Sequence, residues 1–384
     1  MLPTQNIDSL LKDLNENKAM ALFLGAGTDV TECYPGHDGS RSALRNTRYR
    51  SPFCDKHDRR AMYKKYKEKI NMIKQDDSNE KLWGLNWNSL LAELKNNATL
   101  NKEEFAAWNI SGLDNPMQAA LLKYKLKNRY IPIIKDWLYS RCNHQILLDS
   151  LPYYKLYMKS RLNDGDILKI LKNVPFYTLF VLADLILRKP SIRAVFTQNY
   201  NNFLSDAINI LWNSRVELGC DDVYKERQPI DVYDGWKDKK YTDNCLLIYH
   251  VHGYIPPSSE MKPKNISNHI VLTHEEFNSL SHDVYSWQNA SQLHYLTHHT
   301  CLLCGLSLND LTSLRLLNHA NLERSSEKVY WLTAGLKNSI EELKARYFES
   351  QHLTVIHDAE GYPHFYHVIS SEIAKKDKAT NQTK

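Results

Sequence analysis

The chain of 384 residues is long enough for two domains, or for one α/β domain that carries a large insertion. Hydrophobic residues make up 42% of it, which supports a sizeable core, and a net charge of +5 is too mild to imply nucleic-acid binding by itself. Seven irregularly spaced cysteines argue against a disulfide framework and for a reducing compartment. No secretory signal opens the chain and its longest apolar run, Val174 to Leu187, is too short to span a bilayer, so we expect a cytoplasmic protein without a membrane segment.

A strand that runs into a glycine-rich turn begins the predicted fold. After a short amphipathic helix over residues 7–17, the apolar run from Met20 to Leu24 ends at Gly25, Ala26 and Gly27. Backbone N–H groups in such a turn can approach a phosphate, because glycine has no Cβ to block the contact. The third glycine of a dinucleotide fingerprint is missing, so an ordinary tight turn is the alternative.

Two insertions are expected after this turn. The first, residues 31–83, is basic: from Arg41 to Lys81 it holds thirteen Lys and Arg against six Asp and Glu, with a predicted helix from Arg59 to Ile73. The lysines of this helix form either a solvated face or a surface for nucleic acid or an acidic partner. The second insertion, residues 84–190, has helical periodicity almost throughout and no convincing strand.

Polar side chains stand at the end of the next predicted strand. The apolar run from Ala194 to Phe196 ends in Thr197, Gln198 and Asn199, and a helical pattern starts at Asn201. A strand that ends in this way feeds a ligand crevice at the carboxyl edge of an open α/β sheet. Amides offer a donor and an acceptor without charge, so Gln198 and Asn199 suit a sugar or a carboxamide; the alternative is a strand end followed by an Asn N-cap.

A histidine follows the strand that is predicted from Leu246 to Val251. His252 is well placed for acid–base chemistry because the ordinary imidazole pKa lies near neutrality. His250, on the same face, fits a hydrogen-bonded core histidine equally well. The charged residues from Val216 to Asp243 predict no element, and Ile270 to Thr273 predicts a short strand.

The run from Cys301 to Leu306 predicts another buried strand, with Ser307 and Asp310 at its end. Cys301 and Cys304 have the spacing of half a metal site. Both lie inside the apolar run and the sequence has no second close pair, so we expect two small buried hydrophobic residues and no metal.

The alternation of strands and helices predicts the fold class. Val329 to Ala334 and Leu353 to Ile356 supply two more strands, which makes six core strands besides the short one from Ile270 to Thr273. The prediction is an α/β fold with a Rossmann-like, parallel six-stranded sheet and a large α-helical insertion. We expect residues 1–30 and 191–371 to form the sheet domain and residues 372–384 to be a disordered tail.

Four strand ends would meet at one edge of such a sheet. They are Gly25 to Asp29, Thr197 to Asn201, His252 with Gly253, and Gly305 to Asp310. Together these segments could hold a dinucleotide and cleave the bond between nicotinamide and ribose. That reaction needs an oriented leaving group and a positioned water, but no machinery for hydride transfer.

These segments resemble the motifs of a known family. GAG at 25–27, TQN at 197–199, HG at 252–253 and GLSLND at 305–310 stand in the order found in sirtuins. The pattern Gly84-x-x-Trp87-x-x-Leu90-Leu91 and the missing zinc ribbon resemble, more narrowly, the bacterial sirtuin-like proteins of anti-phage defence.

The resemblance implies NAD+ as the substrate and a role for each motif. Residues 25–27 would cradle the pyrophosphate, and Gln198 and Asn199 would face the nicotinamide ribose, with Asn199 helping to place the attacking water. His252 would be the general base or a partner of a ribose hydroxyl. Ser307 and Leu308 would line the adenosine side. The complete set of expected NAD+ contacts is Gly25, Ala26, Gly27, Thr28, Asp29, Thr197, Gln198, Asn201, Gly305, Ser307 and Leu308.

The resemblance also implies an activity and partners. Members of the defence branch degrade NAD+ to nicotinamide and ADP-ribose, which implies an NAD+ glycohydrolase that depletes NAD+ in abortive infection. A homo-oligomer and a sensor subunit, such as a HerA-type ATPase or an Argonaute-like protein, are the implied partners. Nucleic acid would bind through the segment from Arg41 to Lys81 or through a partner.

Two alternatives stay open: an NAD-dependent protein deacylase or ADP-ribosyltransferase, and a scaffold subunit that binds nucleotide or nucleic acid. Asp29 stands where sirtuins usually have Ser, and Asn201 where they usually have Asp. The Asn201 change and the missing zinc ligands weigh against deacylation more than against hydrolysis.

Overall fold

The computed structural model describes residues 5–16, 18–31, 83–84, 87–101, 103–104, 108, 112–139, 141–160, 171, 176–224, 232–234, 246–257, 270–283, 285–323, 328–334, 339–358 and 362–382. The segment from Arg41 to Lys81, with its predicted helix, lies outside these residues. Among the helices that are described, none is long and apolar enough to cross a membrane.

Seven strands of the described chain form one parallel sheet in the order β5-β6-β4-β1-β7-β8-β9. Their bounds are β1 Met20–Leu24, β4 Ile192–Thr197, β5 Val232–Asp234, β6 Leu246–His250, β7 Thr300–Cys304, β8 Val329–Ala334 and β9 Leu353–Asp358. The predicted α/β class with a Rossmann-like parallel sheet is confirmed. The predicted number of strands was one too low, because β5, at the sheet edge, belongs to a charged segment for which no element was predicted.

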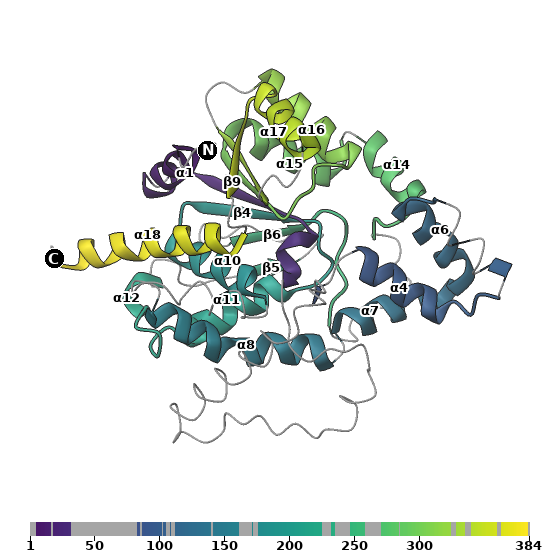
Figure 1. Cartoon of the computed structure of the whole chain (residues 1–384), viewed down its shortest axis with the longest axis horizontal. Helices are drawn as coiled ribbons and strands as arrows, with labels where there is room; N and C mark the ends of the chain where they lie inside the picture. The colour runs from purple at the N-terminus through teal and green to yellow at the C-terminus, as the bar shows by residue number, and fades with distance from the viewer. Residues whose placement is uncertain are drawn as a thin grey trace.

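Helices cover both faces of the sheet, as Figure 1 shows. Side chains alternate along β1, so Ala21 and Phe23 join one apolar cluster, with α15, α16 and α17, while Leu22 and Leu24 join another, with α1, α8, α10, α11 and α18. The bounds of these helices are α1 Gln5–Asn15, α8 Arg141–Ser160, α10 Tyr177–Arg188, α11 Phe203–Asn213, α15 Trp287–His298, α16 Leu311–Glu323, α17 Ser339–Ser350 and α18 Tyr362–Gln382. Burial on both faces explains why the strands of this sheet read as continuous apolar runs.

A group of helices from the predicted insertion packs beside α14 (His274–His282) at one end of the molecule (Figure 1). The group contains α4 (Trp87–Asn97), α6 (Asn115–Leu126), the 3-10 turn η3 (Lys127–Arg129) and α7 (Tyr130–Tyr139). Asp114 caps α6, accepting a hydrogen bond from the backbone N–H of Met117 at 3.0 Å. Two polar contacts join α6 and its cap to α14: a hydrogen bond between His274 Nε2 and the Asp114 carboxylate at 3.0 Å, and an ion pair between Lys123 and Glu276 at 2.5 Å.

A short antiparallel pair stands at the two ends of the basic insertion. Val30 of β2 (Val30–Thr31) pairs with Gly84 of β3 (Trp83–Gly84), and Thr31 pairs with Trp83. The chain therefore leaves and re-enters the described structure at neighbouring points.

The expected disordered tail from residue 372 onward is wrong up to Gln382, because α18 continues that far. Ile373 is buried in the core, and the carboxylate of Asp377 accepts a hydrogen bond from the guanidinium of buried Arg188. Arg188 also donates to Asp184 at 2.8 Å and lies over the ring of Tyr224 at 5.6 Å. The lysine-rich end of α18 therefore stays ordered, because the buried guanidinium of Arg188 needs the carboxylate of Asp377 as a partner.

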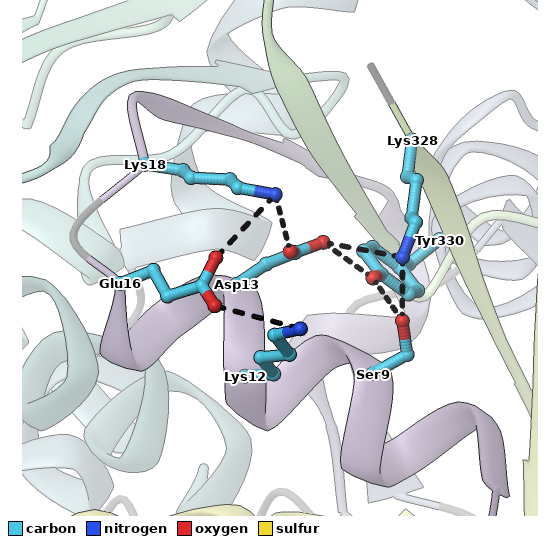
Figure 2. A network of polar contacts seen from close by, with 7 residues as sticks. All are labelled: Ser9, Lys12, Asp13, Glu16, Lys18, Lys328 and Tyr330. Atoms are coloured by element: carbon cyan, nitrogen blue, oxygen red, sulfur yellow. Dashed lines mark hydrogen bonds and ion pairs between the residues drawn. The ribbon is translucent and has the colours of Figure 1, made fainter. Parts of the chain in front are cut away.

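A polar network fastens α1 to the strand β8, as Figure 2 shows. At its centre is Asp13, a buried carboxylate that accepts hydrogen bonds from the hydroxyl of Tyr330 at 2.6 Å and from the ammonium of Lys18 at 2.8 Å. Lys328 lies 3.9 Å from the same carboxylate and donates to the Ser9 hydroxyl at 2.8 Å. Burial raises the pKa of Asp13, but the hydrogen bonds from Lys18 and Tyr330 outweigh it, so the pKa lies below its ordinary value.

Candidate functional site

The two predicted catalytic residues follow the ends of adjacent parallel strands, β4 and β6, at the carboxyl edge of the sheet. Thr197 on β4 pairs with His250 on β6, and Asn199 and His252 each lie two residues beyond this pair. The strand ends are tied together, since the Val251 N–H donates to the Thr197 carbonyl at 3.0 Å. His250 donates from Nδ1 to the Asn199 carbonyl at 2.7 Å and is therefore the core histidine of the two.

The side chain of Asn199 is fixed by the glycine-rich turn after β1. Its Nδ2 donates to the Gly25 carbonyl at 3.3 Å and to Thr28 Oγ1 at 3.1 Å. Thr28 Oγ1 in turn donates to the same carbonyl at 2.8 Å. Because Gly25 offers only an acceptor here, Asn199 must present its nitrogen to the turn, which leaves Oδ1 as the acceptor for a ligand.

The glycines of this turn pack against the end of β7 instead of opening toward a phosphate. Gly25 N–H donates to the Cys304 carbonyl at 2.9 Å, and Gly27 N–H donates to the Gly305 carbonyl at 3.1 Å. A Cβ on Gly25 would lie 2.4 Å from the Gly305 oxygen. The expectation that these two N–H groups face a phosphate is therefore wrong, because they hold two neighbouring strand ends together. Ala26 to Asp29 form a 3-10 turn, η1, and the side chain of Asp29 lies outside the described part.

Gln198 connects β4 to the start of α16. Its backbone N–H donates to the Leu24 carbonyl at 2.9 Å, and its Nε2 donates to Ser313 Oγ at 3.2 Å. Ser313 N–H donates to Asp310 Oδ1 at 2.7 Å, so Asp310 caps the helix. The loop after β7 and the end of β4 are thus joined by side chains.

Two of the predicted contact residues have structural hydrogen bonds. Thr197 Oγ1 accepts from the Asn199 N–H at 3.1 Å. The buried Asn201 accepts from the Phe203 N–H at 3.0 Å at the start of α11, as expected of an Asn near a helix N-terminus. Both residues shape the backbone that carries Asn199.

His252 is buried beside an aromatic ring. Phe277 on α14 meets its imidazole edge to face, with ring centroids 5.3 Å apart. Burial lowers the pKa of His252, and the negative charge of Asp310 partly offsets this effect. The ring is therefore neutral and able to accept a proton near neutral pH.

The segment from Ile270 to Thr273 was predicted as a strand, but it is an extended loop that supports His252. The Val271 N–H donates to the His252 carbonyl at 2.8 Å, and the Val271 carbonyl accepts from the Tyr200 hydroxyl at 2.7 Å. Glu276 accepts from the N–H groups of Leu272 and Thr273, both at 2.7 Å. Because these bonds use the backbone groups that a sheet would need, the apolar residues form a support and not a strand.

Two more of the predicted NAD+ contacts, Ser307 and Leu308, lie in the loop after β7 and differ in their exposure. Ser307 is exposed, whereas Leu308 is buried in the apolar cluster with α16 and α17, at a φ of +51°. Leu308 thus belongs to the core and does not line an open adenosine site as expected. Lys344 donates to the Ser307 carbonyl and, at 2.6 Å, to Asn309 Oδ1, which fixes the loop to α17.

A cavity of about 10 Å³ lies beside Asn199, between the sheet and the helices α10 and α11. Its lining residues are Leu24, Thr28, Leu179, Thr197, Asn199, Asn201, Leu204, Ser205, Ile248 and His250. This space has the size of one water molecule, which is far too small for a dinucleotide.

Cys301 and Cys304 lie on opposite faces of β7. Cys301 packs in the cluster with α15 to α17, and Cys304 in the cluster with α10 and α18. Two thiols on opposite faces cannot bind one ion, so the structural interpretation of this pair is correct. Burial raises the pKa of the Cys304 thiol to about 12.

Two partners of the site were not singled out from the sequence. Ser313 gives no motif of its own, although Asp310-x-x-Ser313 has the spacing of a helix N-terminus. Phe277 lies on a helix whose start is readable, because Thr273-x-x-Glu276 forms a capping box. Neither pattern indicates that α16 or α14 packs on the strand ends.

A family model described as a SIR2-like domain matches residues 193–356, which include β5, β6, β7 and β8 and most of β4 and β9. None of the curated proteins matches the chain. The matched range contains Asn199, His252 and Asp310, while the turn at Gly25 lies outside it. Residues 193–356 are therefore similar to a SIR2-like domain.

Proposed function

We propose that the protein is an NAD+ glycohydrolase that cleaves NAD+ to nicotinamide and ADP-ribose. One observation carries the proposal: Asn199 and His252 each follow by two residues the paired residues Thr197 and His250, which end adjacent parallel strands. The carboxyl edge of the strands is where open α/β sheets bind nucleotides.

The donor and acceptor groups at this edge suit NAD+. Asn199 Oδ1, Gln198 Oε1 and the ring nitrogens of His252 make no hydrogen bond to another described residue. They offer a carboxamide and two ribose hydroxyls the partners that such groups require. None of the three carries a fixed charge, which suits a substrate whose reacting ring is itself positively charged.

In the proposed reaction, Asn199 Oδ1 accepts a hydrogen bond from the attacking water and His252 takes up the proton that the water loses. The water oxygen bonds to the anomeric carbon of the ribose as the bond from that carbon to the nicotinamide nitrogen breaks. The bonding electrons leave with nicotinamide, which becomes neutral. A neutral, buried His252 has the protonation state that this role needs.

The biological setting is part of the proposal and is supported by the motif resemblance. Depletion of NAD+ would stop an infected bacterial cell as part of anti-phage defence. An enzyme that depletes NAD+ must stay inactive until infection, so we propose a low basal activity. We further propose that it is a homo-oligomer in the cytoplasm. A sensor subunit such as a HerA-type ATPase would activate it.

The test is nicotinamide release from NAD+ by the purified protein, alone and with candidate sensor subunits. We expect His252→Ala and Asn199→Ala each to lower the rate by about 10²-fold to 10⁴-fold, the usual share of acid–base and positioning groups. The matched controls are His282→Ala and Asn209→Ala, two exposed positions on α14 and α11. Release that depends on an acyl-lysine or protein acceptor would instead support a deacylase or a transferase. No release under any condition would overturn the proposal.

A further inference from the structure

Helix α6 is apolar on two sides. One side packs in the core through three residues, Ala119, Leu122 and Leu126. On the other side, Met117, Leu121 and Tyr124 are between 38% and 79% exposed. Their spacing of four and then three residues places them in one stripe along the helix. A helix that is apolar on every side is normally buried on every side.

Helix α17 has a second stripe of the same kind. Its inner side packs in the core through Ala345 and Phe348. On its outer side, Ile340, Leu343 and Tyr347 are between 52% and 76% exposed. Single exposed apolar residues are common on protein surfaces, but a row of three on one face of a helix is typical of an interaction surface.

The two stripes match when the helices lie antiparallel. Going forward along α6, the intervals are four residues from Met117 to Leu121 and three to Tyr124. Going backward along α17, they are four residues from Tyr347 to Leu343 and three to Ile340. Each large apolar side chain of one stripe therefore faces one of the other, and both helices are 12 residues long.

The charges beside the stripes match in the same orientation. From Asn115 to Arg129 the chain has no acidic residue, and its basic residues stand at the end of α6 and in η3: Lys123, Lys125, Lys127 and Arg129. The first turn of α17 holds Glu341 and Glu342. An antiparallel arrangement brings these basic and acidic ends together. The pairs that Lys125 and Glu342 make with Glu104 and Arg346 are exposed, so they contribute little and do not oppose new pairing.

We propose that the stripe on α6 of one copy of this chain binds the stripe on α17 of a second copy, with the two helices antiparallel. The inference rests on the homo-oligomer that is part of the proposed function and gives it an interface. Figure 1 shows α6 and α17 at separate places in the molecule, so the contact joins different copies. Each copy offers both stripes, and the contact is head-to-tail.

Both helices support loops at the candidate site. Lys123 on α6 pairs with Glu276 on α14, the helix whose Phe277 packs on His252. Lys344 on α17 donates to the carbonyl of Ser307 in the loop after β7. The proposed contact therefore links supports of the candidate sites in two copies.

The experiment measures the mass of the full-length protein by sedimentation and light scattering over a range of concentrations. We expect the natural protein to self-associate, and Leu121→Glu and Leu343→Glu each to weaken the association by about 10-fold to 100-fold, as at the centre of an interface. The matched control is Leu322→Glu, at an 84% exposed leucine near the end of α16, which should leave the mass unchanged. Glu341→Lys keeps both stripes and should weaken the association by a smaller factor.

A mixture of the two leucine variants tests which stripes meet. Leu121→Glu keeps the stripe on α17, and Leu343→Glu keeps the stripe on α6, so the mixture should form a dimer with one chain of each that neither variant forms alone. If α17 paired with α17, Leu121→Glu would still assemble by itself. If α6 paired with α6, Leu343→Glu would do so. Either result would overturn the proposed contact.

Failure of this inference is distinct from failure of the proposed reaction. A natural protein that stays monomeric at every concentration, or an oligomer that survives both leucine substitutions, overturns the interface and leaves NAD+ cleavage untouched. An oligomer that behaves as expected but releases no nicotinamide under any condition overturns the glycohydrolase, while the contact between α6 and α17 stands.

Discussion

Gly305 faces the backbone nitrogen of Thr28 so closely that a Cβ on Gly305 would lie 2.5 Å from it. The φ of Gly305 is +63°, a conformation that side chains disfavour. Gly112, on the helical insertion, has almost the same φ of +60°, but a Cβ there would meet no atom within 4 Å. A comparison of the two glycines therefore separates the cost of a positive φ from the cost of a steric clash.

Alanine substitutions at these glycines form a matched pair. Gly112→Ala should cost about 1–2 kcal/mol of unfolding free energy from the positive φ alone. Gly305→Ala should cost about 1–3 kcal/mol more, because two backbone segments must also move apart. It should also abolish NAD+ binding, since Asn199 is held by the turn that would move. Denaturant unfolding and calorimetric NAD+ titration measure the two effects, and equal costs for both variants would contradict the packing argument.

Asp13→Asn should destabilise the protein at neutral pH by about 1–3 kcal/mol, the range for loss of a hydrogen-bonded buried charge. Because the folded pKa of Asp13 is lowered, its contribution is present above the unfolded pKa of about 3.9 and is lost as pH falls toward the folded value. The difference in unfolding free energy between natural protein and variant should therefore shrink in acid. Urea unfolding across pH tests this, with exposed Asp8→Asn as the control. A difference that stays constant with pH would contradict the assignment.

The cluster of Arg188, Asp184, Tyr224 and Asp377 should keep the end of α18 packed on the rest of the protein. Arg188→Met leaves Asp184 buried without its cation, and we expect a loss of about 3–5 kcal/mol. Asp377→Ala should cost less and act locally, raising amide hydrogen exchange in the last turns of α18. Lys375→Met breaks the exposed pair with Glu372 on the same helix and should change stability by less than about 0.5 kcal/mol. Equal exchange in Asp377→Ala and Lys375→Met would show that the cluster does not hold the helix.

Cys304 should resist alkylation in the native protein. Burial raises the pKa of its thiol to about 12, so almost no thiolate exists in mildly alkaline solution, whereas an unfolded cysteine titrates near about 8.5. Mass spectrometry after brief iodoacetamide treatment should find Cys304 labelled only after unfolding in urea. Labelling at equal rates in both states would place the thiol at a surface.

The six strands predicted from apolar runs are present because burial on both faces leaves a plain signal in the sequence. β5 has only three residues at a sheet edge, and no apolar run marks it. Ile270 to Thr273 has the composition of a strand, but Glu276 and the His252 carbonyl bind its backbone groups, a long-range event that local pattern does not encode. The order at Asp377 depends in the same way on a distant, buried Arg188.

The candidate site could likewise be predicted only in part. The motifs at Asn199 and His252 predict chemistry from residue type and strand end, and the register then places both on one edge. The glycines after β1 were interpreted as a phosphate turn, because sequence shows the missing Cβ but not which neighbour fills the space. That neighbour, Gly305, is far away in sequence and adjacent in the sheet.

β1 is the first strand of the chain and the middle strand of the sheet. Ala21 pairs with Ala194 on one side and with Cys301 on the other, and the SIR2-like match begins only at residue 193. A fragment that starts there would present two half-sheets, each with a bare inner edge that invites aggregation. Both of its neighbours come much later in the sequence, and such long-range pairing slows folding. If the chain were cut in the basic insertion, the N-terminal piece with β1 would still be needed to join the two halves of the sheet.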